Sequence, residues 1–292
     1  MKISVIIPTM NEPAIVDVLH DVRDALQQQS VEVIVVDKSK DETATRAASL
    51  GAKVIHQIGT GYGDAYITGF KQVSEDVETV VILDGDYTYD PYDIPKLLQL
   101  INEGADLVIG TRFPLTDERA MSRRNVLGNR ILTALIRFLY HVRLSDSQSG
   151  MRAIKRSALD RLKLRSAHMP FASEMIIEAQ KEGLTIAEVP ISYRTRVGRP
   201  KLDPFRDAFS ILFTSVRLVR DYNPIVIFLP IGLALMLLGL GYGVTILIEY
   251  LHTGVVTRLA AAILSVLLIL TGLQITLFGL LADVILTNLR RR

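Results

Sequence analysis

The sequence predicts an α/β domain with a mostly parallel, doubly wound sheet, followed by an amphipathic helix and two membrane-spanning helices. Three observations support this prediction. Short apolar runs alternate with amphipathic segments, the fourth apolar run ends at two aspartates, and charged residues become rare after residue 224. Alternating strands and helices are typical of parallel sheets, whose ligands bind at the carboxyl ends of the strands.

The individual elements are predicted from periodicity. Short runs rich in β-branched residues predict strands over residues 2–8, 31–36, 53–58, 80–83 and 105–110. Apolar residues at helical spacing predict helices over residues 14–29, 43–50, 64–73 and 94–102. Because the two kinds of element alternate, the strands are expected to be parallel and to share one ligand-binding edge.

Acidic and basic residues are balanced in the first part of the chain and scarce in the rest. Of 33 Lys and Arg only four lie beyond residue 224, and of 31 Asp and Glu only two do. These residues are Arg258, Arg290, Arg291, Arg292, Glu249 and Asp283. The chain has no cysteine, which excludes disulfides and thiolate metal sites.

The fourth apolar run, Val80 to Leu83, stops at Asp84-Gly85-Asp86. Two carboxylates at the carboxyl end of a buried strand suit a hard divalent cation, Mg²⁺ or Mn²⁺, that also binds substrate phosphates. A polar turn is the alternative for this triplet, since Asp-Gly is a common turn dipeptide.

Candidate ligand residues lie at or after the ends of the first and second strands, namely Pro8, Thr9, Asn11, Glu12 and Asp37. Together with Asp84 and Asp86, they resemble the nucleotide-sugar-binding half of an inverting family 2 glycosyltransferase with the GT-A, Rossmann-like fold. The resemblance extends over most of the chain before residue 200. It implies that the five residues bind the base and ribose of the donor. It also implies that Asp84 and Asp86 hold the ribose and a divalent metal on the diphosphate.

Two positions depart from the family pattern. Lys38 stands where many members have a second acid, and Gly61-Tyr62-Gly63 stands where members often carry Gly-Lys-Gly. The glycines from Gly59 onward also resemble a dinucleotide fingerprint. The third glycine would fall at Asp64, and the segment follows the third strand rather than the first, so a dehydrogenase is disfavoured.

Later motifs narrow the resemblance to polyprenyl-phosphate hexose synthases. Asp146 to Arg152 matches their Asp-x-x-Ser-Gly-Phe-Arg element, with Met151 in place of Phe, and Arg112 matches the family's Gly-Ser/Thr-Arg element. The loop from Arg194 to Leu202 resembles their Arg-x-x-Gly-x-Ser-Lys-Leu segment. The resemblance implies catalytic roles for Asp86, Arg112, Asp146 and Arg152. It implies acceptor or phosphate binding by Ser149, Arg196 and Lys201. Arg123 and Arg124 are further candidates for the lipid phosphate if Arg196 and Lys201 bind the diphosphate instead.

These residues suit transfer of a hexose from a nucleotide diphosphate sugar to dolichyl or another polyprenyl phosphate. A phosphomonoester has a second pKa near about 6, so the acceptor is already an anion at pH 7 and needs little help from a general base. A metal and nearby arginines would stabilise the leaving diphosphate. Arg152 would position the lipid phosphate, Asp146 would orient it, and single displacement would invert the anomeric centre. Tyr87-Thr88-Tyr89 resembles members that use UDP sugars, which favours UDP-hexose over GDP-mannose.

Two alternatives remain from the sequence. One is another family 2 enzyme that builds a polysaccharide or glycolipid; such members usually carry a Gln-x-x-Arg-Trp element, and this chain has no Trp. The other is a non-enzymatic membrane protein that binds lipid phosphate.

Several segments indicate a membrane. Residues 125–144 carry an apolar stripe flanked by arginines, and residues 203–224 form a second amphipathic segment. Such helices lie at anionic membrane surfaces, although a basic excess is otherwise typical of a solvated face or a nucleic-acid patch. No nucleic-acid partner is expected. Residues 225–251 and 259–289 both exceed the roughly 20 residues needed to span a bilayer.

The predicted organisation is a catalytic domain over residues 1–202, an interfacial helix and linker over 203–224, and a transmembrane hairpin over 225–292. Arginines before the first span and at the end of the chain predict that both termini are cytoplasmic, since the connecting loop contains only Arg258. This topology agrees with the cytosolic supply of nucleotide sugars. A homo-oligomer is left open.

Overall fold

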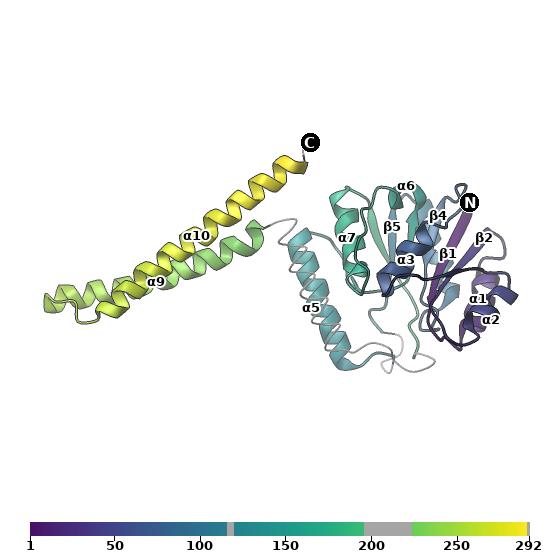
Figure 1. Cartoon of the computed structure of the whole chain (residues 1–292), viewed down its shortest axis with the longest axis horizontal. Coiled ribbons are helices and arrows are strands. Elements are labelled where there is room, and N and C mark those ends of the chain that lie inside the picture. The colour runs from purple at the N-terminus through teal and green to yellow at the C-terminus, as the bar shows by residue number, and fades with distance from the viewer. Residues whose placement is uncertain (116–119, 196–223, 291–292) are drawn as a thin grey trace. The chain divides into compact units, whose positions relative to one another are not determined.

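The computed structural model of the chain describes residues 1–115, 120–195 and 224–290 (Figure 1). It divides into two units, Met1–Thr214 and Ser215–Arg292. The first unit is built around a sheet and the second around a helical hairpin. The predicted phosphate ligands Arg196 and Lys201 lie outside the described residues, as does the predicted interfacial helix before Pro224.

Seven strands form one mixed sheet in the order β3-β2-β1-β4-β6-β5-β7. They are β1 (Lys2–Thr9), β2 (Ser30–Asp37), β3 (Lys53–His56), β4 (Thr79–Ile82), β5 (Leu107–Thr111), β6 (Arg152–Lys155) and β7 (Ile186–Pro190). The first four strands pair in parallel, as do β5 and β7, whereas β6 runs antiparallel to both β4 and β5. The predicted class, an α/β fold with a mostly parallel sheet, is therefore confirmed.

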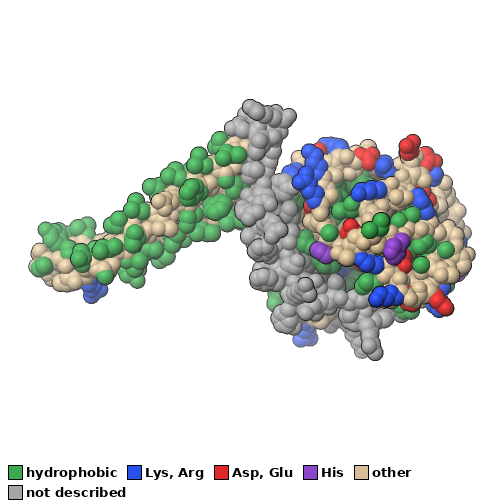
Figure 2. Space-filling model, viewed as in Figure 1, with side chains coloured by type: hydrophobic (Ala, Val, Ile, Leu, Met, Phe, Trp, Pro, Cys, Tyr) green, Lys and Arg blue, Asp and Glu red, His purple; other side chains and the backbone are tan. Residues whose placement is uncertain are grey.

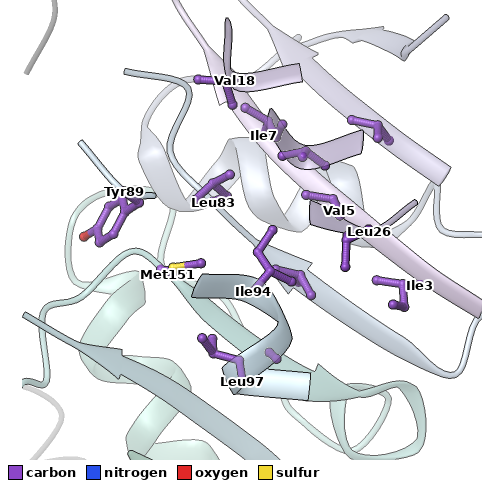
Figure 3. Close-up of a cluster of buried hydrophobic side chains, with 14 of the residues drawn as sticks. Ile3, Val5, Ile7, Val18, Leu26, Leu83, Tyr89, Ile94, Leu97 and Met151 are labelled. Carbon is purple, nitrogen blue, oxygen red and sulfur yellow. The ribbon is translucent and has the colours of Figure 1, made fainter. Parts of the chain in front are cut away.

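Helices cover both faces of the sheet (Figure 1). One face carries α1 (Ile15–Ala25), α2 (Thr43–Ser49) and α4 (Ile94–Asn102), the last preceded by the short 3₁₀ helix η1 (Pro91–Asp93). The other face carries α3 (Tyr62–Phe70), α5 (Arg123–Tyr140), α6 (Arg156–Leu159) and α7 (Phe171–Lys181). Side chains of a strand alternate between faces, so β1 directs Ile3, Val5 and Ile7 into the first core (Figure 3) and Ile6 into the second.

The topology brings distant segments to one edge of the sheet. Thr9 at the end of β1 pairs with Asp37 at the end of β2, and Thr111 at the end of β5 pairs with Pro190 at the end of β7. Because β6 is antiparallel, its first residue pairs with Ile82, the last residue of β4. The segment that leads into β6 therefore reaches the carboxyl end of β4, where Asp84 follows.

The second unit consists of α9 (Ile225–Thr253) and α10 (Leu259–Arg290), which match the two predicted spans. Their apolar segments, Ile225–Thr253 and Leu259–Ile285, have 29 and 27 residues and are long enough to cross a membrane. The helices approach closely where glycines face the neighbouring helix: a Cβ on Gly232 would lie 2.6 Å from the carbonyl oxygen of Gly272. Figure 2 shows hydrophobic side chains along the outside of this hairpin.

Candidate functional site

The two acids after β4 are held in different ways. Leu83 N–H donates to the Ile6 carbonyl at 3.1 Å, which extends the pairing with β1 beyond β4. Asp84 Oδ1 then accepts from the Tyr66 hydroxyl at 2.9 Å. Asp86 Oδ1 accepts from the Thr88 hydroxyl at 2.6 Å and from the Thr88 N–H at 3.1 Å. Both carboxylates are therefore oriented before any ligand binds.

The Asp84 carboxyl binds its proton more tightly than an ordinary aspartate does. Burial and the neighbouring charge of Asp86 raise the pKa of Asp84 to about 6, although the Tyr66 and Tyr62 hydroxyls and the charge of Arg112 oppose this shift. Burial and Asp84 in turn raise the pKa of Tyr66 well above its usual value, which keeps that hydroxyl a donor. Two carboxylates this close repel each other, and a cation between them would relieve the repulsion.

The donor set fits a hard divalent ion. Among the residues that the structure describes, no group of three or more His, Cys, Asp or Glu side chains is gathered at one place. Asp84 and Asp86 would thus supply only two carboxylates. Mg²⁺ is commonly bound in this way, by one or two carboxylates with waters and substrate phosphates completing the shell.

The loops after β1 and β2 are tied to each other. Asp37 is buried, and its Oδ1 accepts from the hydroxyls of Thr9 at 2.7 Å and Ser39 at 2.5 Å. Asn11, in the left-handed conformation at φ 53°, donates its N–H to the Ser39 hydroxyl at 2.7 Å and accepts from the Lys40 N–H at 2.8 Å. The predicted base and ribose ligands therefore form one connected wall.

Glu12 and Pro8 belong to the same wall. Glu12 is buried, and its N–H donates to the Thr43 hydroxyl at the start of α2, at 3.1 Å. Gly85 packs behind Pro8, since a Cβ at Gly85 would lie 3.1 Å from the Pro8 carbonyl oxygen. Lys38, the departure from the family pattern, donates to the Gly59 carbonyl and so ties this wall to the loop before α3.

Arg112 and Asp146 form a buried bidentate pair. Arg112 donates Nε to Asp146 Oδ2 at 2.7 Å and Nη2 to Oδ1 at 2.9 Å, and its backbone N–H donates to Oδ2 at 3.1 Å. The side chains are 7% and 0% exposed. Burial acts to raise the pKa of Asp146, but the charge and hydrogen bonds of Arg112 outweigh it and the pKa is lowered. Asp146 thus stays ionised and fixes the direction of the Arg112 guanidinium.

Arg152 is placed differently from its prediction. It is 1% exposed and donates to the backbone carbonyls of Ser147 at 3.0 Å, Ser149 at 3.0 Å and Ala172 at 2.7 Å. A guanidinium that is buried against three carbonyls does not contact a lipid phosphate, so the expected role for Arg152 is corrected to positioning the segment before β6. The sequence could not show this, because a motif does not reveal which way an arginine points.

The segment before β6 closes against the acids. Gly150 N–H donates to the Tyr89 hydroxyl at 2.7 Å. A Cβ at Gly150 would lie 2.6 Å from Asp84 Oδ2 and 2.8 Å from the Tyr62 hydroxyl. A side chain at this position would have to displace the Asp84 carboxylate or the Tyr62 hydroxyl. Ser149, predicted to bind phosphate, is fully buried in the same segment.

A set of residues around the acids was not predicted to take part in the site: Tyr62, Tyr66, Tyr89, Tyr193 and Glu188. Glu188 on β7 accepts the N–H groups of Ser145 at 2.7 Å and Asp146 at 3.0 Å. The Tyr193 ring lies 5.2 Å below the Arg112 guanidinium and 5.2 Å from the Tyr89 ring. The sequence signals were Tyr62, where the family often has lysine, and Tyr89, the last residue of the Tyr87-Thr88-Tyr89 element.

The start of the basic loop is anchored beside the acids. Tyr193 pairs with Tyr89 in an isolated antiparallel β-bridge, and Arg194 N–H donates to the Thr88 carbonyl at 2.7 Å. The Arg194 guanidinium pairs with Asp90 and lies 5.3 Å from the centre of the Tyr87 ring. Arg194 is therefore anchored to Thr88, the residue whose hydroxyl and N–H bond to Asp86.

α5 divides its apolar residues between the core and the surface. Leu132 and Ile136 are buried, whereas Leu127, Ile131 and Phe138 are 60%, 55% and 72% exposed. The helix begins after Ser122, whose hydroxyl accepts from the Asn125 N–H at 3.2 Å. Arg123 and Arg124 occupy its first turn. In the described residues, no hydrogen bond or ion pair links Arg123 to the Asp84 and Asp146 cluster.

The chain is similar to known proteins over most of its length. The model of "Glycosyl transferase family 2" matches residues 4–163, and that of "GtrB C-terminal hairpin" matches residues 223–288. The chain is 34% identical over 292 residues to "Glycosyltransferase AglJ" of Haloferax volcanii, covering 98% of this chain and 94% of that protein. It is 38% identical over 210 residues to the "Dolichyl-phosphate hexose transferase" of the same organism, covering 72% and 90%.

A solved structure shares the fold. Glucosyl-3-phosphoglycerate synthase from Mycobacterium tuberculosis, in complex with Mn²⁺, UDP-glucose and phosphoglyceric acid, superimposes with a TM-score of 0.60 at 25% identity. The match covers 74% of this chain and 79% of that one.

Proposed function

Because the chain belongs to glycosyl transferase family 2, we propose that it transfers a hexose from a UDP sugar to dolichyl or another polyprenyl phosphate, with inversion and with a divalent metal. Family membership makes the chain a glycosyltransferase and removes the non-enzymatic alternative. The observation that carries the proposal is a single edge of the sheet bearing the oriented acids Asp84 and Asp86 and the buried Arg112–Asp146 pair. The same chain has two apolar helices long enough to cross a membrane.

The donor would lie across the carboxyl ends of β1, β2 and β4. The wall of Pro8, Thr9, Asn11, Glu12 and Asp37 would bind the base and ribose, and Asp84 and Asp86 would hold the metal beside the diphosphate. A bound Mg²⁺ or Mn²⁺ would neutralise the charge that develops on the leaving group. Arg112, held in direction by Asp146, would add a fixed positive charge to the same edge.

The acceptor needs orientation more than activation. Its phosphate is already an anion at pH 7, so the enzyme has to bring an oxygen of this phosphate to the anomeric carbon. We propose that Arg196 and Lys201 bind that phosphate. Their support is the anchoring of the preceding residues, 193 and 194, against Tyr89 and Thr88 beside the acids.

The membrane side of the proposal rests on the hairpin and on α5. The exposed apolar residues of α5 would contact the bilayer surface. The cytoplasmic face is supported by the arginines at the end of the chain. A polysaccharide-building activity is less well supported, because the chain has no Trp for the Gln-x-x-Arg-Trp element.

The test is transfer by the purified full chain in lipid nanodiscs. UDP-glucose, UDP-N-acetylglucosamine and GDP-mannose, each radiolabelled, are offered with dolichyl phosphate, with undecaprenyl phosphate, or with dolichol as the matched lipid that lacks the phosphate. We expect lipid-linked label from one UDP sugar, only with a phosphorylated lipid, and none in EDTA. Transfer to dolichol, or undiminished transfer in EDTA, would overturn the acceptor or the metal assignment respectively.

A further inference from the structure

One carboxamide side chain lies in the middle of a segment, residues 259–282, whose other polar side chains are the hydroxyls of Ser265, Thr271 and Thr276. Between residues 259 and 282 of α10, Gln274 is the only charged or carboxamide residue, and residues 225–248 of α9 contain none. The candidate span Leu259–Ile285 has 27 residues. Gln274 therefore lies within roughly 3 Å of its midpoint along the helix axis.

Gln274 faces away from its own hairpin. The residues of α10 that contact α9 include Ser265, Ile269, Gly272 and Thr276. Gln274 follows Gly272 by two positions, which places it about 200° around the helix. It is exposed, and within the described hairpin it has no hydrogen-bond partner. Two hydroxyl-bearing residues of α10, Ser265 and Thr276, donate to the carbonyls of Gly239 and Gly272.

Gln274 belongs to a continuous stripe on the outer side of α10, which we call the outer seam. Its members, alternately four and three positions apart, are Ile263, Leu267, Leu270, Gln274, Leu277 and Leu281. The apolar members are 49% to 58% exposed. This spacing is that of helices that pack side by side at a small angle.

We propose that the outer seam is the contact between two copies of this chain, and that Gln274 of one copy forms a paired hydrogen bond with Gln274 of the other. The inference rests on the membrane insertion of the hairpin that the proposed function includes. A carboxamide without a partner is unfavourable in hydrocarbon, where no water is present to replace the missing bonds. Polar residues within spans accordingly face other helices and bond across the interface.

A second copy of this chain can provide the hydrogen-bond partner of Gln274 without any additional polar group. Two copies with the same topology place Gln274 at the same depth. A carboxamide carries both donor and acceptor, so it is complementary to itself across a two-fold axis along the membrane normal. A different membrane protein would need a matching polar group at that depth.

The chain has no cysteine, so single cysteines can report the contact without background. Leu270→Cys and Leu277→Cys lie one turn on either side of Gln274, and Leu237→Cys on α9, which is 67% exposed, is the matched control. In isolated membranes treated with copper phenanthroline, we expect disulfide-linked dimers from the two outer-seam variants and not from Leu237→Cys.

The role of the carboxamide is then tested in the same backgrounds. Gln274→Met keeps the length of the side chain and removes its hydrogen bonds, and Gln274→Asn keeps a carboxamide. We expect Gln274→Met to raise the dissociation constant of the dimer in nanodiscs by about tenfold, and Gln274→Asn to raise it less. Far-UV circular dichroism should show the same helicity in all variants.

The outcomes separate this inference from the proposed function. Equal cross-linking at residue 237 and on the outer seam, an unchanged dissociation constant for Gln274→Met, or cross-links only to another protein would overturn the paired contact. If these occur while phosphate-dependent sugar transfer persists, the proposed function stands and only this inference fails. If alkaline carbonate releases the chain from membranes, the hairpin does not span the bilayer, and both the outer-seam contact and the proposed function at the membrane fail.

Discussion

Replacing Asp146 by asparagine should destabilise the first unit by about 3 to 5 kcal/mol, the usual cost of breaking a buried ion pair from one side. Asp146 is fully buried and accepts from three nitrogens of Arg112 and from the Gln148 N–H at 3.1 Å. Asparagine keeps one acceptor oxygen but turns the other into a donor that faces the guanidinium. The Arg112 charge is then buried without a counter-ion. Since domains are stable by about 5 to 15 kcal/mol, the variant should still fold.

The measurement is urea unfolding of the full chain in detergent. Because the chain has no Trp, the near-ultraviolet circular dichroism of its tyrosines follows the first unit, which contains most of them. The matched control is Asp160→Asn, which breaks an ion pair with Arg156 in which the Asp160 side chain is 58% exposed. That change should cost less than about 1 kcal/mol.

A second substitution tests the reason for the loss. Arg112→Met in the Asp146→Asn background removes the uncompensated charge and keeps one oxygen, which can accept either from the N–H of residue 112 or from the N–H of Gln148. The double variant should therefore be more stable than Asp146→Asn alone, while sugar transfer stays lost because the arginine charge is gone. This account of the pair would be refuted if Asp146→Asn lost no more stability than Asp160→Asn. It would also be refuted if the stability losses from Asp146→Asn and Arg112→Met simply added in the double variant.

The stabilisation of the fold by Asp146 is predicted to depend on pH in one direction. The pKa of Asp146 is lowered in the folded state, so the unfolded chain binds its proton more readily. The stabilisation by Asp146 is fully present above the unfolded value of about 3.9 and is lost as the pH falls through the lower folded value. The difference in free energy of unfolding between wild type and Asp146→Asn should thus be constant between about pH 5 and 8 and shrink only in stronger acid.

Further predictions concern the acids, the glycine behind them, the acceptor loop and the topology. Asp86→Asn should abolish transfer in the nanodisc assay without lowering the unfolding midpoint, because asparagine keeps one oxygen to accept from Thr88; retained activity would exclude Asp86 as a metal ligand. Gly150→Ala should reduce transfer by roughly a hundredfold by displacing Asp84, whereas Gly128→Ala, where a Cβ meets nothing within 4 Å, should not. Arg196→Ala and Lys201→Ala should each lower efficiency with the lipid phosphate at least about tenfold, with unchanged donor affinity by calorimetry; the reverse pattern would assign them to the diphosphate. Reporters fused to either terminus should be cytoplasmic, and an external C-terminus would contradict the hairpin topology.

The fold and the location of the site followed from the sequence for one physical reason. Buried parallel strands read as uninterrupted apolar runs, and the carboxyl ends of such strands meet at one edge. Thr9, Asp37 and Asp84 could therefore be placed together before any coordinates. The bond from the Tyr66 hydroxyl to Asp84 could not be predicted, because a tyrosine in an amphipathic helix serves equally well as a core residue.

The antiparallel strand β6 explains both what was missed and why the site works. Four residues with Arg152 and Lys155 at the ends show no clear two-residue alternation, so nothing in the sequence marks a strand. Its reversed direction nevertheless carries Asp146 to Gly150 to the end of β4, where glycine can touch Asp84. Arg152 then has no access to a ligand and binds the carbonyls of the segment instead. The motif thus combines two tasks: Arg152 shapes the segment from within the core, and Asp146, placed by that segment, fixes the direction of Arg112 at the edge where we propose that the donor binds.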